Sequence, residues 1–254
     1  MRRFVLPILV VFALVTSALA QQPAPLPKLT WIRYYTVQPG KGDTFVRLMR
    51  QSSQKMFDEL LAGKKVQAWG IVVPMTHTDE TWTHAIYITM DDWASVESLV
   101  RAVEAADTSS DAALEATLVS GSIRDVVLRH IIQSEAPPKA APKYIDVSTY
   151  VVKPGRANDA VALYREWAVP MLTAAAMRGN VGPWGLSSQA IDTNGSWTHM
   201  TWTFLSDLNA LGDRETDMMA LPANKLMGYD VRLRDLSEPE KHREQILRVI
   251  YAAP

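Results

Sequence analysis

Two spacings of hydrophobic residues alternate along this chain in a fixed order. Residues 31–38 and 66–73 are rich in aromatic and β-branched residues, which is typical of β-strands. Between them, apolar residues from 45 to 61 recur near the spacing of an α-helix. The pattern up to residue 133 predicts the order strand, helix, strand, strand, helix, strand. The predicted strands are 31–38, 66–73, 82–90 and 125–133, and the predicted helices are 43–61, 92–106 and a short one at 111–119.

Polar and turn-forming residues mark the ends of the predicted helices. Asp43 and Asp92 stand just before helical spacing begins, where a carboxylate accepts hydrogen bonds from the first turn. Both are therefore predicted caps. Gly63 follows the last apolar position of the first helix and is its predicted end.

The second half of the chain repeats the first half. Three matched motifs stand 115 positions apart, as His84 and His199 do. A fourth match, Leu-Arg at 128–129 and 247–248, is 119 positions apart, so the second copy carries about four extra residues in its last third. Such a duplication in one register predicts two similar structural units. The three matched motifs are residues 35–40 with 150–155, Trp-Gly at 69–70 with 184–185, and Trp-Thr-His at 82–84 with 197–199.

The second copy departs from the first in three places. Its first helix, predicted at 159–178, contains Pro170, which removes a helical hydrogen bond and is expected to kink or split it. The sequence Asp-Thr-Asn-Gly at 192–195 predicts a tight hairpin turn. Residues 218–240, which include two prolines, are expected to be the least regular part.

The segments outside the two copies have their own signatures. Residues 1–20 combine two arginines, an apolar run and a small-residue cleavage pattern, which predicts a secretory signal peptide. We therefore expect export to the periplasm or the extracellular space, and no membrane anchor after cleavage. Residues 21–28 form a Pro-rich lead-in, and 135–143 a Pro-rich linker between copies at 29–134 and 144–254.

Composition excludes several classes of function. The 26 basic and 27 acidic residues give a formal net charge of −1, which argues against a general nucleic-acid binder. The chain has no cysteine, so disulfides, thiol nucleophiles, iron–sulfur clusters and cysteine zinc sites are excluded. No histidine spacing is typical of a metal site, and no metal is predicted.

The order of elements, β-α-β-β-α-β in each copy, is the ferredoxin-like arrangement. One face of such a sheet is covered by helices, and the other must be buried by a second unit. Over nearly its whole length after residue 28, the chain resembles a fused tandem of the dimeric α/β-barrel superfamily, the antibiotic-biosynthesis-monooxygenase-like fold. The resemblance implies an α+β, single-chain pseudo-dimer. It carries no catalytic motif, and further oligomerisation stays open.

The repeated histidines, His84 and His199, are the sharpest candidates for a site. Strand alternation puts each on the same face as Trp82 or Trp197. We assign this face to the barrel interior, because the alternate positions are bulkier and are expected to lie under helices. In one interpretation the histidines contact a ligand as proton acceptor, donor or metal ligand. In the other, which we favour, they are structural. The unrepeated histidines, including His130, are interpreted as surface or structural.

Two further pairs complete the candidate ligand-binding residues. Trp82 and Trp197 would stack on an aromatic ligand or plug the barrel. Arg129 and Arg248 have apolar alternation partners, so each is expected on a partly buried side. They would hold a ligand carboxylate or pair with an internal acid such as Asp125 or Asp146, and we favour the internal pair.

The sequence favours a protein that binds a small apolar or aromatic molecule in the barrel half-sites. Three alternatives stay open. The first is a monooxygenase-like enzyme that uses no cofactor, with His84 or His199 as base. The second is a haem-binding protein with a histidine as axial ligand, although no cofactor is predicted. The third is a purely structural module.

The Trp-Gly pairs at 69–70 and 184–185 carry a separate prediction. Trp69 and Trp184 are expected in the core, and the glycine after each is expected to allow the close approach of another part of the backbone.

Overall fold

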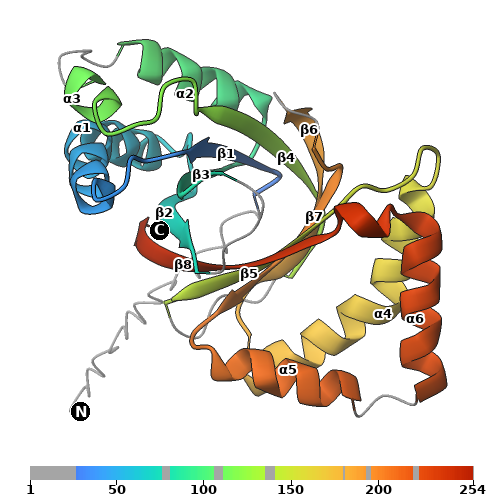
Figure 1. The fold of residues 1–254 in the computed structure, drawn as a ribbon. Helices are drawn as coiled ribbons and strands as arrows, with labels where there is room; N and C mark the ends of the chain where they lie inside the picture. The colour runs from blue at the N-terminus through green and yellow to red at the C-terminus, as the bar shows by residue number, and fades with distance from the viewer. Residues whose placement is uncertain are drawn as a thin grey trace, which may run out of the picture.

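A closed barrel of β-strands forms the centre of the molecule, with helices on two opposite sides (Figure 1). The computed structural model describes residues 27–75, 81–105, 111–134, 141–179, 181–192, 196–219 and 223–253. Within these residues, eight strands pair in the order β1-β3-β2-β8-β5-β7-β6-β4, and β4 closes the ring on β1. All pairings are antiparallel.

Copy one contributes β1 to β4, in the sheet order β4-β1-β3-β2. The helices α1 and α2 connect its strands as the ferredoxin-like pattern requires. Asp92 caps α2 as predicted, because its Oδ1 accepts a hydrogen bond from the Ser95 amide at 2.8 Å. The bounds are β1 (Leu29–Tyr35), α1 (Gly42–Ala62), β2 (Ala68–Pro74), β3 (His84–Met90), α2 (Trp93–Ala105), α3 (Asp111–Glu115) and β4 (Arg124–Gln133).

Copy two repeats this sheet order as β8-β5-β7-β6. Its helices cover the opposite side of the barrel (Figure 1). The prediction of an α+β fold with two ferredoxin-like repeats in one barrel is therefore confirmed. The bounds are β5 (Tyr144–Tyr150), α4 (Ala157–Arg178), β6 (Trp184–Asp192), β7 (His199–Leu205), α5 (Asn209–Met219), α6 (Ala223–Leu236), the 3₁₀ turn η2 (Pro239–Lys241) and β8 (Arg243–Ala253).

The two copies meet along two seams, where β2 pairs with β8 and β6 pairs with β4. A Cβ on Gly70 would lie 2.6 Å from the Tyr251 carbonyl oxygen across one seam, and a Cβ on Gly185 equally close to that of Ile132 across the other. Both glycines therefore allow the close backbone approach that the Trp-Gly pairs predict. The seams bring the backbones of the two copies together where only glycine fits.

Both seams also contain a β-bulge at the same place in each copy. Pairing passes from Val249 to Tyr251 in β8 and from His130 to Ile132 in β4. Ile250 and Ile131 are the skipped residues. They stand 119 positions apart, the same separation as the Leu-Arg motifs. The duplication therefore extends to an irregular feature that re-aims neighbouring side chains.

Apolar side chains fill three separate clusters. One lies under α1 and α2 and includes Phe45 and the fully buried Trp69. A second lies under α4 and includes Trp184. The third occupies the barrel interior and takes residues such as Val126 from copy one and Val147 from copy two. The two copies therefore share one interior core, as two half-covered sheets require.

Three local predictions are wrong. Asp43 lies in the first turn of α1, but Lys41 is the N-cap residue and no side chain caps the helix. Helix α4 is not split, since it runs through Pro170 without a break. The expected irregular stretch at 218–240 is largely helical in its described part, because α5 and α6 occupy it.

Other predictions are not tested by this structure. The signal peptide and most of the lead-in, the hairpin tip at 193–195 and most of the linker lie outside the described residues. None of the helices in the described part of the chain is both long and apolar enough to cross a membrane.

Candidate functional site

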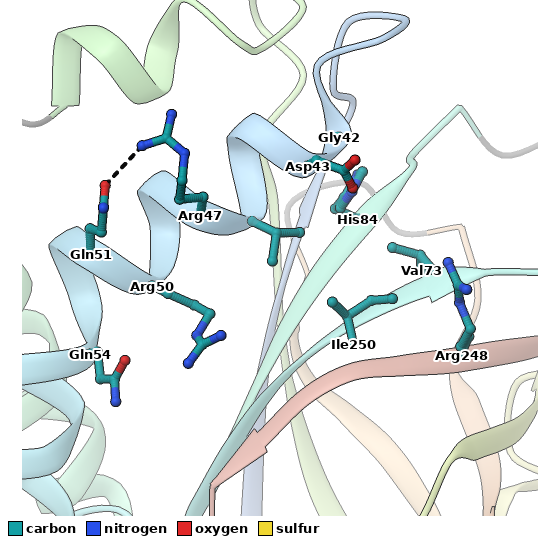
Figure 2. A pocket seen from close by; sticks show the side chains of 11 residues that line it. Gly42, Asp43, Arg47, Arg50, Gln51, Gln54, Val73, His84, Arg248 and Ile250 are labelled. Carbon is teal, nitrogen blue, oxygen red and sulfur yellow. Dashed lines mark hydrogen bonds between the residues drawn. The ribbon is translucent and has the colours of Figure 1, made fainter.

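A groove of about 460 Å³ lies between α1 and the outer face of the barrel in copy one (Figure 2). Helix α1 forms one wall, and strands β2, β3 and β8 form the floor. Because β8 belongs to copy two, the groove lies over a seam between the copies. The α1 side chains are Asp43, Val46, Arg47, Arg50, Gln51 and Gln54, and the floor side chains are Val73, His84, Arg248 and Ile250.

Among the described residues, His84 is the one histidine that lines this groove. It is the first residue of β3 and packs against Phe45 of α1, with ring centroids 5.0 Å apart. A methyl group on Gly42 would lie 3.4 Å from its Cε1 and Nε2 atoms. Burial lowers the pKa of His84 to about 4, and the nearby Asp43 carboxylate only partly opposes this shift. The imidazole is therefore neutral at pH 7.

The hydrogen bonds of Thr83 position the ring of His84. The Thr83 hydroxyl oxygen accepts a hydrogen bond from the Val37 amide at 2.8 Å. It also lies 2.9 Å from His84 Nδ1 and 3.4 Å from the Tyr35 carbonyl oxygen. The hydroxyl either donates to Nδ1, or accepts from Nδ1–H and donates to Tyr35, and these two arrangements correspond to opposite tautomers of the ring. In both, Nδ1 is bonded to Thr83, and Nε2 is the ring nitrogen left for the groove.

Three arginines give the groove its charge. Arg47, Arg50 and Arg248 face one carboxylate, Asp43, so the lining carries a formal net charge of +2 while His84 is neutral. The Arg50 guanidinium carbon lies 4.6 Å from the centroid of the Tyr251 ring, which positions it by a cation–π contact. Arg47 donates to Gln51 at 3.1 Å. Among the described residues, no carboxylate lies within ion-pair distance of Arg50 or Arg248.

The equivalent place in copy two has different chemistry. Ala157 stands where copy one has Gly42, and His199 is only 7% exposed. The Thr198 hydroxyl lies 2.9 Å from His199 Nδ1, as in copy one, and burial lowers the pKa of His199. The two histidines therefore keep the same local hydrogen bond. They differ in how open their surroundings are.

The prediction that His84 and His199 face the barrel interior is wrong. The residues after them, Ala85 and Met200, belong to the interior cluster, so the histidines point outward under the helices. The bulky residues Tyr87 and Trp202, which we assigned to the helix-covered face, pack in the interior. A closed barrel needs large side chains inside, and bulk alone therefore does not identify the outer face.

Trp82 and Trp197 do lie in the interior cluster, away from the groove. Both precede the first residue of their strands, so the alternation that places the histidines does not extend to them. Trp82 packs 5.0 Å from Tyr34, and the Arg124 guanidinium lies 6.0 Å from the Trp197 ring. These contacts agree with the interpretation that the two indoles plug the barrel.

Arg129 and Arg248 are both exposed, not on a partly buried side as expected. Asp125, one of the acids proposed as a partner, instead accepts hydrogen bonds from Arg33 at 2.7 and 2.9 Å. Of the six sequence candidates, the structure brings only His84 and Arg248 together in one groove.

The sequence interpretation missed the polar face of α1. Arg47, Arg50, Gln51 and Gln54 are spaced as residues on one side of a helix, so the signal was present. It was hidden because α1 also carries the apolar residues that pack on the sheet. Comparison of the two copies would have revealed it, since Ala162 and Val169 replace Arg47 and Gln54 in copy two.

The described residues contain no group of three or more histidine, aspartate or glutamate side chains that could hold a metal ion. The prediction of no metal site stays a prediction.

Comparison with known proteins shows the fold. No family model and no curated protein matches the sequence. A "putative monooxygenase" from Fusobacterium nucleatum matches with a TM-score of 0.61 at 10% identity, over 90% of this chain and 94% of that chain. One of the same description from Lactobacillus acidophilus has a TM-score of 0.58 at 10% identity, over 89% and 96%. An anthrone oxidase-like protein has a TM-score of 0.55 at 10% identity, over 91% and 94%.

These matches and the barrel topology define a dimeric α/β-barrel protein in which both half-barrels belong to one chain. The resemblance that the sequence indicated is confirmed at the level of fold.

Proposed function

We propose that this chain binds a small, partly apolar molecule in the groove between α1 and strands β2, β3 and β8. The observation that carries the proposal is the groove itself, which combines an apolar floor with the ring Nε2 atom of His84. A volume of about 460 Å³ is within the range of small-molecule sites. Val73 and Ile250 supply apolar contact area, and a few polar groups at the rim would fix the orientation of the ligand.

The barrel interior is a poorer candidate for the site. Side chains from both sheets pack there as one apolar cluster, including Trp82, Trp197 and Trp202. A ligand in this space would have to displace close-packed side chains, which is costly. The groove needs no such rearrangement, and we therefore place the ligand outside the barrel.

The geometry supports binding better than proton abstraction by His84. A pKa of about 4 makes the imidazole a weak base, and its Nδ1 is already bonded to the Thr83 hydroxyl. Nε2 is suited to a hydrogen bond with a polar group of a ligand. Two of the similar structures are named monooxygenases and one is named anthrone oxidase-like, but oxidation of a molecule bound here would have to use groups other than His84.

Haem ligation has little support in this groove. An axial histidine must direct an unprotonated nitrogen at the iron. A methyl group added to Gly42 would lie 3.4 Å from Nε2 of His84, so the start of α1 restricts the space beside that nitrogen.

A thermal-shift screen tests the proposed function. A set of small aromatic and aliphatic compounds, neutral and charged, is added to the purified protein and to the variant Ile250→Trp, which fills the groove. A true ligand at a hundredfold excess over its Kd is expected to raise the Tm of the parent by about 5 to 10 °C. The same ligand should leave the Tm of Ile250→Trp unchanged.

The matched control is Ile131→Trp, at the equivalent bulge in β4 at the other seam, which should respond like the parent. The proposal is wrong if no compound raises the Tm, or if Ile250→Trp responds as strongly as the parent.

A further inference from the structure

We infer that the groove recognises an organic carboxylate, with the carboxylate held by Arg248 and the apolar body on Val73 and Ile250. This rests on the proposed function, since it names the class of molecule that the groove would bind. In Figure 2, Ile250 lies between the side chains of Arg50 and Arg248. A compact molecule with one carboxylate therefore pairs with one cation and lies on the apolar surface, while the other cation adds to the positive charge of the groove.

The charges of the groove require a counter-ion. The lining carries three arginines and one aspartate, and Arg248 has no carboxylate within ion-pair distance in the described part of the chain. Arg50 is positioned by the Tyr251 ring, which leaves its N–H groups available as donors. The planar guanidinium matches a carboxylate with two parallel hydrogen bonds, and such charged pairs are about twice as strong as neutral ones.

His84 and Asp43 orient the ligand within the groove. Asp43 lies beside His84 at the end of the groove where α1 begins (Figure 2). Its negative charge repels an anion, so the carboxylate is expected at an arginine and not beside His84. Nε2 of His84 then remains for a neutral polar group of the ligand, such as a hydroxyl, which can donate or accept a hydrogen bond.

The second copy shows that this chemistry is not simply a property of the fold. Arg165 of copy two corresponds to Arg50 of copy one, and Arg129 of copy one corresponds to Arg248 of copy two, so two of the cations are repeated at the equivalent place. The rest of the wall has changed. Glu166, which replaces Gln51, forms an ion pair with Arg232 of α6 at 2.8 Å. The substitutions from copy one to copy two are Gly42 to Ala157, Asp43 to Asn158, Arg47 to Ala162, Gln51 to Glu166 and Gln54 to Val169.

A pair of probes that differ only in charge tests the inference. Binding of 2-naphthoate and of the neutral 2-naphthamide is measured by isothermal titration calorimetry on the full-length mature protein. We expect the carboxylate to bind at least about tenfold more tightly than the amide, as one charge-assisted contact provides. Its affinity should fall as salt is raised, while the affinity of the amide should not.

Matched variants locate the effect. Arg248→Gln should remove most of the preference for naphthoate, whereas Arg129→Gln, the equivalent exposed residue on β4 at the other seam, should keep it. If Arg248→Gln does not fold, Arg50→Gln with Arg165→Gln as its control makes the same test.

Each outcome decides the matter. Equal binding of both probes, lost in Ile250→Trp, overturns the carboxylate inference and leaves the proposed groove function standing. A preference for naphthoate that survives in both Arg248→Gln and Arg50→Gln also overturns the inference, because the anion is then bound elsewhere. If neither probe binds while neutral compounds bind in the thermal-shift screen, the inference is wrong and the groove function is kept. If the screen also finds no ligand, both fail.

Discussion

At the scale of single residues, one methyl group distinguishes the surroundings of the two repeated histidines. His84 and His199 begin equivalent strands, and each lies 2.9 Å from the hydroxyl of the preceding threonine. The neighbouring helix begins with Gly42 in copy one and with Ala157 in copy two. A methyl group on Gly42 would lie in van der Waals contact with Nε2 of His84. The absence of that methyl helps to keep His84 open to the groove.

The first prediction concerns this opening. Diethyl pyrocarbonate, which acylates accessible neutral imidazoles, should modify His84 faster than His199. The variant Gly42→Ala should slow the modification of His84 severalfold and leave the rate at His199 unchanged. Because alanine favours a helix more than glycine does, the free energy of unfolding should stay equal or rise by up to about 1 kcal/mol. Peptide mass spectrometry gives the rates. Equal rates at His84 in the parent and the variant would contradict the assignment.

His130 is a second histidine with a defined role, in a polar network beside the interior cluster. Its Nδ1 lies 2.8 Å from the Ser187 hydroxyl, and its Nε2 lies 2.8 Å from the Thr30 hydroxyl. The Trp202 indole donates to the same serine at 3.0 Å. Both ring nitrogens are therefore bonded, which fits a structural histidine. Burial lowers the pKa of His130 to about 4 from its ordinary value of 6.5.

The second prediction is an acid-sensitive stability. Between pH 6.5 and 4 the unfolded chain binds a proton at residue 130 that the folded chain does not, so stability is full above pH 6.5 and falls toward pH 4. His130 alone should account for about 1 to 2 kcal/mol of the loss between pH 7 and 5. In His130→Gln that share should disappear. Urea unfolding at both pH values measures it, with the half-buried His242→Gln as control. An unchanged pH dependence in His130→Gln would refute the role.

Part of the candidate site could be predicted from the sequence. Strand alternation identified which side chains share a face, and the repeat identified His84 and Arg248 as candidates. Alternation did not identify which face is outside, because Tyr87 and Trp202 are bulky and yet fill the barrel. It also did not show that Arg50 and Arg248 line the same groove, because this arrangement depends on how α1 packs across strands from the other copy. Sequence spacing within one element carries no such information.

At the scale of elements, helix α4 differs from its counterpart α1 in both surface and backbone. Lys55 of α1 corresponds to Pro170 of α4, and both residues are exposed. The helix continues through the proline from Ala157 to Arg178 and ends at Gly179, whose φ of 87° is the left-handed conformation that glycine adopts easily. Tertiary packing of Leu163 and Leu172 on the sheet side thus overrides the local cost of proline.

The third prediction measures that cost. Pro170→Ala should raise the free energy of unfolding by about 1 to 3 kcal/mol, because alanine restores a main-chain donor and removes a ring that crowds the preceding turn. Lys55→Ala in α1 is the matched control and should change stability by less than about 0.5 kcal/mol. Chemical denaturation of the two variants and the parent gives both values. A destabilised Pro170→Ala would mean that the ring itself makes contacts that α4 needs.

At the scale of the whole molecule, the fold follows from the repeat more directly than the site does. Two ferredoxin-like sheets each leave one apolar face uncovered, and a single closed barrel buries both. Order and duplication therefore predicted two sheets packed face to face, and the resemblance to the dimeric α/β-barrel superfamily implied the barrel. The Trp-Gly pairs also predicted a close backbone approach at Gly70 and Gly185. The bulges at Ile131 and Ile250 and the partner strands of the two glycines required the structure, since they depend on how strands of different copies align.

The last prediction follows from this shared core. If the chain is cut between residues 137 and 138, the two halves should associate one to one when expressed together, because each supplies half of the interior cluster and one strand of each seam. Co-purification and native mass spectrometry measure the complex.

Gly70→Ala should weaken the complex of the two halves, because a Cβ there would lie 2.6 Å from the carbonyl oxygen of Tyr251 in the other half. Gly212→Ala in α5, away from the seams and with nothing within 4 Å of its added Cβ, controls for the replacement of a glycine by alanine. Halves that fold separately as monomers would show that neither sheet needs the other, and the groove, whose floor contains Arg248 and Ile250 from the second half, would then be incomplete in both.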